Sequence, residues 1–306
     1  MRISVLRALL LGCAATSFIA CGPAARSRPP GGDDDGTGVD SGPCTVSPEG
    51  DTTTCADGID NDCDGLVDCS DPNCSGVGAC PICGMVQHPL SQPLALPDGL
   101  NSGTSCTSSS SCAAATPSCV IDECHAAYTS KLHFDGFAAN QTFTAVSNIQ
   151  KVCVNIEHSW FRDIEVRLIA PDGKEVELVK MPGRDPVIEE YLGKANDCDS
   201  DATPVPGVGA DYCWTPTATN PSMISYINAG SPMSSVANCN MGTSQELPPG
   251  DYGIDGQWNT LIGAPLNGDW QIQVTDAWSI DNGYIFSWSI AFDPSLVTDC
   301  SGPVIQ

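Results

Sequence analysis

An acidic segment between Cys55 and Cys74 has the residue types and the spacing of a cation site. Five carboxylates lie within twelve positions, at Asp60, Asp62, Asp64, Asp68 and Asp71. Carboxylates folded to about 6 Å from one another repel by roughly 0.7 kcal/mol per pair even in water. A compact loop of this sequence therefore needs a cation to offset the repulsion. Oxygen donors of this kind favour a hard divalent cation.

The spacing also distinguishes between cations. Counted from Asp60, the carboxylates fall at positions 1, 3, 5, 9 and 12, and Gly65 falls at position 6. These are the ligand and glycine positions of an EF-hand-type calcium loop, in which Leu66 at position 7 would offer its backbone carbonyl. Asp71 is shorter than the usual glutamate at position 12, and cysteines rather than helices flank the loop. The segment also resembles a metal-binding repeat of Cys-rich exported bacterial proteins. We expect Ca²⁺ as its cofactor, with a solvated acidic turn as the alternative.

Two other clusters have weaker metal-ligand spacing. The first is Asp197, Asp199 and Asp201, which repeats the two-residue spacing without a following glycine. A solvated loop is the favoured prediction there, and a second metal site is the alternative. The second is Cys80 and Cys83, which could form half of a zinc site but are expected to pair as disulfides in an oxidising compartment.

The first 20 residues predict export. Two arginines precede an apolar run that is too short to span a bilayer. The run ends in a sequence that resembles the lipobox of bacterial lipoproteins, which makes Cys21 the lipidated residue; Cys13 offers a second match, and a plain secretory signal is the alternative. With Gly22 next, the resemblance implies an outer-membrane or cell-surface protein held by a lipid anchor.

Charge and cysteine content restrict the function further. The 306 residues include 12 Lys plus Arg and 37 Asp plus Glu, for a net charge of −25. Such a polyanion repels phosphate backbones, so we expect no nucleic-acid partner. Of 18 cysteines, sixteen remain once Cys13 and Cys21 are set aside (18 − 2 = 16). This even number predicts up to eight disulfides, whose pairing the spacing does not reveal.

The composition changes along the chain. Residues 21–43 are rich in Pro, Gly, Ser and Asp and predict a disordered tether. Residues 44–126 hold eleven cysteines with little periodicity and predict a loop-rich region held by crosslinks. Residues 127–293 change to alternating strands, and residues 294–306 form a C-terminal tail.

Period-two patterns indicate the fold of residues 127–293. Apolar side chains alternate with polar ones in three segments: Ile164, Val166 and Leu168; Trp270, Ile272 and Val274; and Tyr284, Phe286, Trp288, Ile290 and Phe292. Turn residues separate these segments, and no convincing helical period is present. The pattern predicts a mainly β protein built as a β-sandwich or jelly roll.

The same segments carry a family resemblance. The stretches 158–173, 266–276 and 281–292 resemble the P domain (P/Homo B domain) that follows the catalytic domain of subtilisin-like proprotein convertases. The resemblance implies a jelly-roll β-sandwich, with Leu96–Gly99 as its opening motif and Cys106–Cys124 as an insertion. It also implies an association with serine endopeptidases. Some family members bind calcium, which favours Asp163 and the 197–201 loop as further candidate ligands.

Nothing in the sequence predicts catalytic residues. A subtilisin domain places its Asp, His and Ser on a large α/β sheet, which this pattern does not contain. Gly103–Ser105 mimics a nucleophile motif without a following helix. His158, Ser159 and Asp163 are neighbours that cannot surround one substrate atom, so His158 is expected to pack or to form hydrogen bonds.

The sequence therefore predicts a non-catalytic lipoprotein whose P domain binds a protein or glycan ligand. One alternative is an accessory component of a subtilisin-like serine endopeptidase system, with a protease as partner. A structural envelope protein is the other. In each case the membrane is contacted only through the lipid anchor.

Overall fold

The computed structural model describes residues 47, 50–63, 67–74, 77–80, 85–183, 189–196, 198, 203–239 and 242–296. All of them belong to the unit formed by residues 41–306. The predicted signal peptide, the lipidation residue Cys21, the tether and the tail beyond residue 296 lie outside this range. Within it, no helix combines the length and the apolar character that a membrane crossing requires.

Residues 50–80 are loop-rich, as predicted. Their described regular structure consists of three short 3₁₀ turns, η1 (Thr54–Ala56), η2 (Asp68–Ser70) and η3 (Pro72–Cys74). The disulfides Cys55–Cys74 and Cys69–Cys80 crosslink these turns. The buried apolar cluster here consists of Cys55, Cys74, Val77 and Cys80. Crosslinks therefore replace an extended hydrophobic core in this region.

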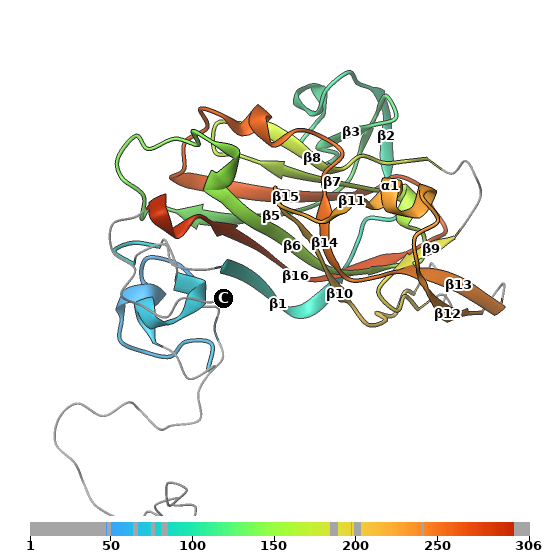
Figure 1. Cartoon of the computed structure of the whole chain (residues 1–306), viewed down its shortest axis with the longest axis horizontal. Helices are drawn as coiled ribbons and strands as arrows, with labels where there is room; N and C mark the ends of the chain where they lie inside the picture. Colours follow the sequence, from blue (N-terminus) through green and yellow to red (C-terminus); the bar gives the residue numbers. More distant parts are fainter. Residues whose placement is uncertain are drawn as a thin grey trace, which may run out of the picture. The chain divides into compact units, whose positions relative to one another are not determined.

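Two sheets form the main body (Figure 1). The larger contains β1 (Met85–Ala95), β6 (Ile149–His158), β9 (Glu190–Leu192), β10 (Ala210–Trp214), β11 (Asn220–Ser222), β12 (Ser234–Asn238), β13 (Gly242–Leu247), β14 (Gly250–Gly253) and β16 (Gly283–Phe292). Its order is β11-β14-β10-β6-β9-β13-β12, and β16 pairs with both β6 and β1. The smaller contains β5 (Tyr128–Phe134), β15 (Gly268–Asp276), β7 (Ile164–Ile169) and β8 (Glu175–Val179), in the order β5-β15-β7-β8.

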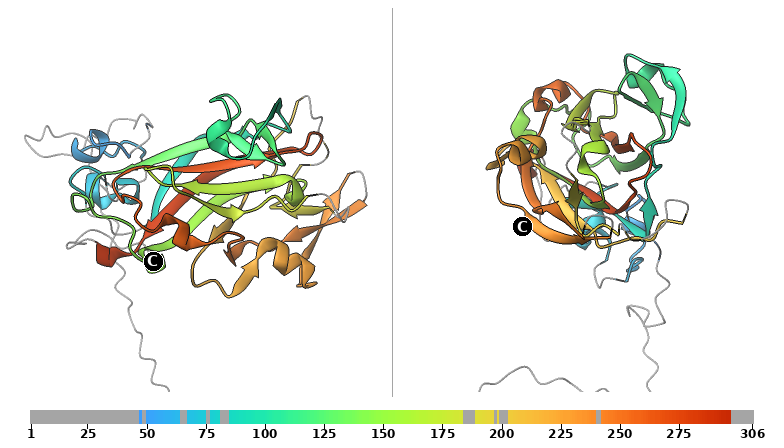
Figure 2. Two further views of the ribbon diagram at one scale, coloured as in Figure 1. Left: turned by 90° about the horizontal axis from the view of Figure 1, so that it is seen from above. Right: turned by 90° about the vertical axis from the view of Figure 1, so that its right-hand side faces the viewer.

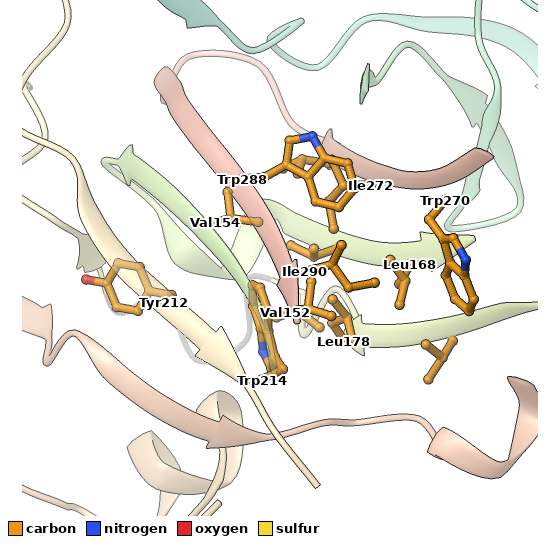
Figure 3. Close-up of a cluster of buried hydrophobic side chains, with 14 of the residues drawn as sticks. Val152, Val154, Leu168, Leu178, Tyr212, Trp214, Trp270, Ile272, Trp288 and Ile290 are labelled. Atoms are coloured by element: carbon orange, nitrogen blue, oxygen red, sulfur yellow. The ribbon is translucent and has the colours of Figure 1, made fainter. Parts of the chain in front are cut away.

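The two sheets share one hydrophobic core, which matches the predicted β-sandwich. Figure 3 shows Val152, Val154 and Ile290 of the larger sheet facing the side chains of the smaller one. The smaller sheet contributes the residues that the alternation predicted, including Ile164, Val166, Leu168, Trp270, Ile272 and Val274. The short helix α1 (Met223–Asn228) adds Met223 and Ile227 to this core. The mainly β prediction is confirmed.

One part of the alternation is wrong. The pattern placed Tyr284 and Phe286 on the same face as Trp288 and Ile290, but a bulge lies between Ile285 and Ser287 where β16 pairs with β6. Because a bulge inserts one extra residue, the side chains before it change face. Ile285 takes the core position instead, and Phe286 is partly exposed.

The larger sheet begins earlier than the predicted boundary at residue 127. β1 lies within the predicted Cys-rich region, yet it pairs with β16 from Met85↔Ala291 to Ala95↔Tyr284. Two prolines in β1 obscured the strand in the sequence, since proline removes a ladder donor and is confined to edges and bulges. β1 occupies such an edge beside β16.

A small three-stranded sheet covers part of the outer face of the smaller sheet, around Arg167 and Thr275. It consists of β2 (Asn101–Ser105), β4 (Glu123–His125) and β3 (Ser118–Val120), and is crosslinked by Cys106–Cys119 and Cys112–Cys124. We call residues 101–125 the insertion; β2 and β3 are labelled in Figure 1, and Figure 2 shows the same body from two further sides. Because the insertion covers them, Arg167 and Thr275 are buried although they point away from the core.

Candidate functional site

A groove of about 440 Å³ lies on the outer face of the larger sheet. Its floor comes from β6, β10 and β16, whose inner faces build the core. In β6, Val152 and Val154 point into the core, so the intervening side chains of the strand point out into the groove. The lining residues are Lys151, Cys153, Asn155, Asp211, Cys213, Pro249, Gly250, Ser287, Trp288 and Ser289.

Strand register places the polar residues of the groove in rows. Asn155 of β6 lies opposite Asp211 of β10 on one side and opposite Ser287 of β16 on the other. The next outward row contains Cys213, Cys153 and Ser289. Cys153 and Cys213 form a disulfide between directly opposed strand positions. The groove floor is therefore a disulfide flanked by hydrogen-bonding side chains.

Two polar contacts hold side chains at the edges of the groove. Nδ2 of Asn155 donates to Oδ1 of Asp211 at 2.8 Å. Nζ of Lys151 lies 2.9 Å from Oδ1 of Asp251, and both groups are partly open to solvent. Pro249 and Gly250, where β14 begins, complete the lining. The chemistry available is that of binding through an ammonium, a carboxylate, an amide and two hydroxyls.

An aromatic ring lies at one end of the polar row. A Cβ on Gly209 would come within 2.1 Å of Oδ1 of Asn155 and 2.4 Å of Cδ2 of Phe286. Asn155 and Phe286 therefore both pack against the backbone of Gly209, which only a residue without a side chain permits. The bulge in β16 is what directs Phe286 to this outer face.

His158, Ser159 and Asp163, which sequence reasoning rejected as a triad, are all buried. Nε2 of His158 lies 3.2 Å from Oδ2 of Asp276, and Nδ1 accepts a hydrogen bond from the backbone of Trp160 at 2.9 Å. The predicted packing and hydrogen-bonding role of His158 agrees with this geometry. Burial is the main cause that raises the pKa of Asp276, and the nearby carboxylate of Asp163 raises it further.

The structure describes part of the predicted calcium loop. Nδ2 of Asn73 donates to Oδ2 of Asp62 at 2.8 Å, and the backbone of Gly58 donates to Oδ1 of Asp68 at 3.1 Å. Asp71 is buried, and its Oδ1 accepts from the backbone of Asn73 at 2.6 Å. Asp60 is half-buried. Asp64 and Leu66 lie outside the described residues, so the predicted ligand set is only partly placed.

Among the described residues, no three carboxylates of the loop have oxygen atoms all within 4.8 Å of one another. In the part of the chain that the structure describes, the only three potential metal ligands with donor atoms all within 4.8 Å of one another are Cys106, Cys112 and Cys119. These sulfurs belong to the two disulfides of the insertion. Cys80 likewise pairs with Cys69, as expected for an oxidised thiol, while Cys83 and the second acidic cluster at Asp197, Asp199 and Asp201 lie outside the described residues.

Comparison with known protein families finds a similarity for the segment that contains β6. Residues 147–197 match the family model of the proprotein convertase P-domain. This chain is similar to the P-domain there. The match runs through β6, β7, β8 and β9, and so includes the central strand of the groove, His158 and the insertion's contact residue Arg167. The predicted resemblance is confirmed in this segment.

Two solved structures are also similar. The crystal structure of the serine protease of Aeromonas sobria is 11% identical over 69% of this chain and 27% of that chain, with a TM-score of 0.24. The crystal structure of the Aeromonas sobria serine protease in complex with its chaperone is 12% identical over 68% of this chain and 27% of that chain, also with a TM-score of 0.24. The chain thus spans about a quarter of each. No curated protein matches it.

Sequence reasoning did not identify the groove. A signal was present, because Lys151, Cys153 and Asn155 alternate with valines, as do Ser287 and Ser289 with core residues. This pattern indicates a solvent-facing strand face. Asp211 joins the site only through the pairing of β10 with β6, across a separation in sequence that no local pattern reveals.

Proposed function

We propose that this protein is a non-catalytic binding protein that holds a protein or glycan ligand in the groove on the outer face of its larger sheet. The observation that carries the proposal is the groove itself: about 440 Å³, with convergent hydrogen-bonding side chains and a disulfide floor. Ligand sites in proteins are commonly concavities of roughly this size with a few placed polar groups.

Filling the groove tests this proposal. Ser287→Trp and Ser289→Trp place a large side chain in it, whereas Gln271→Trp places the same side chain on β15 of the other sheet. The intact mature protein is titrated against panels of immobilised glycans and peptides by interferometry. Binding that the two serine variants remove and the Gln271 variant retains supports the groove. Binding that survives in all three variants would refute it.

We also propose that the Cys-rich region is stabilised by calcium held by Asp60, Asp62, Asp64, Leu66, Asp68 and Asp71. The all-oxygen donor set suits Ca²⁺, and the disulfides Cys55–Cys74 and Cys69–Cys80 crosslink the segment around it. A bound cation would neutralise the carboxylates and favour the compact loop.

Calorimetric titration of the intact mature protein with Ca²⁺ tests the site. The double variant Asp62→Asn with Asp64→Asn should lose the binding heat. The matched control, Asp199→Asn with Asp201→Asn, alters the second acidic cluster and should retain it. Equal binding heats from wild type and the first variant would refute calcium binding by the acidic loop. Loss of the heat in the control variant alone would assign the calcium site to residues 197–201.

The proposed location is the outer membrane or cell surface, through a lipid on Cys21. The motif and the following Gly22 support it. Mass spectrometry of the protein recovered from its native envelope should find an acylated Cys21 at the amino terminus. Cys21→Ser should release the protein from the membrane fraction, whereas Cys13→Ser should not. An unmodified amino terminus would refute the anchor.

The match to the P-domain favours a second candidate function, an accessory role in a serine endopeptidase system. In that case the chain would act on a separate protease. The test is the thermal stability and activity of a subtilisin-like endopeptidase from the same host, measured with and without the purified chain. A shift in either that the groove variants abolish supports this role. Cleavage of a peptide library by the purified chain alone would contradict both candidate functions.

A further inference from the structure

We propose that the groove recognises a neutral, hydroxyl-rich ligand, namely a short glycan of uncharged sugars. This inference rests on the proposed binding function and specifies the ligand class. It follows from three properties of the lining: few charges, in-register hydrogen-bonding groups and small apolar surfaces beside them.

The groove carries few charges, which with the neighbouring Asp251 sum to 1 − 2 = −1. Lys151 and Asp211 contribute one positive and one negative group, and the ammonium of Lys151 is already paired with Asp251. The carboxylate of Asp211 accepts a hydrogen bond from Asn155. The net charge of −25 disfavours an anionic ligand. A cationic ligand would meet only one lining carboxylate. A single carboxylate, already accepting a hydrogen bond from Asn155, is a weak basis for selecting an ion.

The hydrogen-bonding groups suit hydroxyls. Asp211, Asn155 and Ser287 lie in register on three adjacent strands, β10, β6 and β16. Adjacent strands are about 4.8 Å apart, so the row spans roughly 10 Å, which is the length scale of a disaccharide. Amide and hydroxyl side chains both donate and accept, and sugar hydroxyls also do both. Ser289 and Lys151 extend the same surface in the following rows.

Apolar surfaces lie beside this row. The Cys153–Cys213 disulfide forms part of the floor, and the partly exposed ring of Phe286 packs beside Asn155 over Gly209. Sugar rings have apolar C–H faces between their hydroxyls, so a lining that alternates polar and apolar groups complements them.

The topology disfavours a peptide. Peptides commonly bind by adding a strand to an unpaired sheet edge. The floor strands have no such edge, since β10 pairs with β14 and β6, β6 with β10 and β16, and β16 with β6 and β1. The floor strands are thus paired on both sides over most of their length, with β10 paired to β14 from Tyr212 to Trp214, so we expect recognition mainly through side chains.

Titration of the intact mature protein with defined trisaccharides tests the inference. The neutral probes are maltotriose, cellotriose, mannotriose and triacetylchitotriose; trigalacturonate is the anionic probe and deacetylated chitotriose the cationic one. We expect at least one neutral probe to bind, with an affinity that changes little between about 50 mM and about 500 mM salt, because no ion pair with the ligand is screened. Asn155→Ala and Ser287→Ala should each weaken it by about tenfold.

Two matched variants on the other sheet, Gln271→Ala and Thr129→Ala, should leave the affinity unchanged. If only charged probes or peptides bind, and Ser287→Trp removes that binding, the neutral-glycan inference is overturned while the binding function stands. If a neutral probe binds equally well to Asn155→Ala, Ser287→Ala and Ser287→Trp, the groove is not the site and both proposals fail. Absence of binding by every neutral probe overturns the inference.

Discussion

His158 and Asp276 connect the two sheets of the sandwich through a completely buried contact. Nε2 of His158 on β6 lies 3.2 Å from Oδ2 of Asp276 on β15, and neither residue is exposed. Because Nδ1 accepts a hydrogen bond from the backbone of Trp160, the proton must reside on Nε2 and be donated to Asp276. This contact makes one end of the sandwich sensitive to the protonation of Asp276.

The pH dependence of stability should reveal this sensitivity. Burial, assisted by the nearby carboxylates of Asp98 and Asp163 and opposed by His158, raises the pKa of Asp276 to about 6. A raised pKa means that the native state holds a proton that the unfolded state has already released. The free energy of unfolding should therefore decrease as pH rises from the ordinary carboxyl pKa through about 6. Urea denaturation across this range measures it, and Asp276→Asn should flatten the dependence.

Asp269→Asn provides a control of opposite sign. Hydrogen bonds from His133 and Lys131 lower the pKa of Asp269, so its contribution to stability is present above the ordinary carboxyl pKa and is lost as pH falls. Asp269→Asn should change the free energy of unfolding as a function of pH only on the acid side, where the ordinary carboxyl group titrates. An unchanged slope in Asp276→Asn would contradict the assignment of the effect to the buried pair.

Gly283 should be intolerant of any side chain. A Cβ at this position would lie 2.3 Å from Cδ2 of His158 and 2.6 Å from the carbonyl oxygen of Glu157. Gly283→Ala should therefore lower the free energy of unfolding by about 2 kcal/mol or more through overpacking. Gly253→Ala is the matched control, because its Cβ would meet its nearest atom at 3.5 Å. Equal stability losses in urea denaturation would show that the strand relaxes around Gly283.

Arg167 should hold the insertion against the smaller sheet. Nη1 donates to Oγ of Ser109 at 2.7 Å and Nη2 to the carbonyl of Cys119 at 3.3 Å. Nη2 also lies 2.6 Å from Oε1 of Glu165, whose pKa burial raises to about 7 although Arg167 opposes the shift. Arg167→Met should speed amide hydrogen exchange in β3 and β4 and leave β6 unchanged.

Lys174→Met changes a more exposed cation in the turn that joins β7 to β8 and should leave exchange in the insertion as it is in wild type. Protection of β3 and β4 that is equal in the arginine variant and wild type would assign the docking to the Thr275–Ser118 hydrogen bond instead.

The groove disulfide should contribute more to stability than a disulfide of the insertion. Cys153 and Cys213 are 60 residues apart, and Cys106 and Cys119 are 13 apart. Loop-closure entropy of the unfolded chain then predicts losses of about 4 and about 3 kcal/mol for the two Cys→Ser pairs. Chemical denaturation of the oxidised proteins compares them. The reverse order would contradict the loop-closure prediction, whereas no loss of global stability in the Cys106–Cys119 variant would show that the insertion unfolds separately from the sandwich.

The sandwich was predictable because its signals are local. Alternation at Ile164–Leu168 and Trp270–Val274 reports burial of one strand face, and the structure places these residues in the core. Local sequence patterns do not predict features that depend on which strands pair with each other. The bulge that moves Phe286 outward depends on β6, and the role of β1 depends on β16 at the other end of the chain.

The candidate site was less predictable than the fold. The acidic loop was visible because its side chains are close in sequence, whereas Asn155, Asp211 and Ser287 become neighbours only through strand register. The burial of Arg167 and Thr275 could not be predicted either, because it also depends on contacts between segments far apart in the sequence. A polar strand face usually faces water, and only the docked insertion covers it here.

The insertion also links the exposed surface of the protein to its oxidation state. Its described disulfides, rather than an extended apolar interior, crosslink β2, β3 and β4 to one another, and Arg167 and Thr275 then contact the crosslinked unit from the smaller sheet. Thiol reductants would let the insertion unfold, which would break these contacts and hydrate the guanidinium of Arg167 and the hydroxyl of Thr275. More of the outer face of the smaller sheet would then be open to solvent, so the polar surface of the protein would differ between reducing and oxidising surroundings.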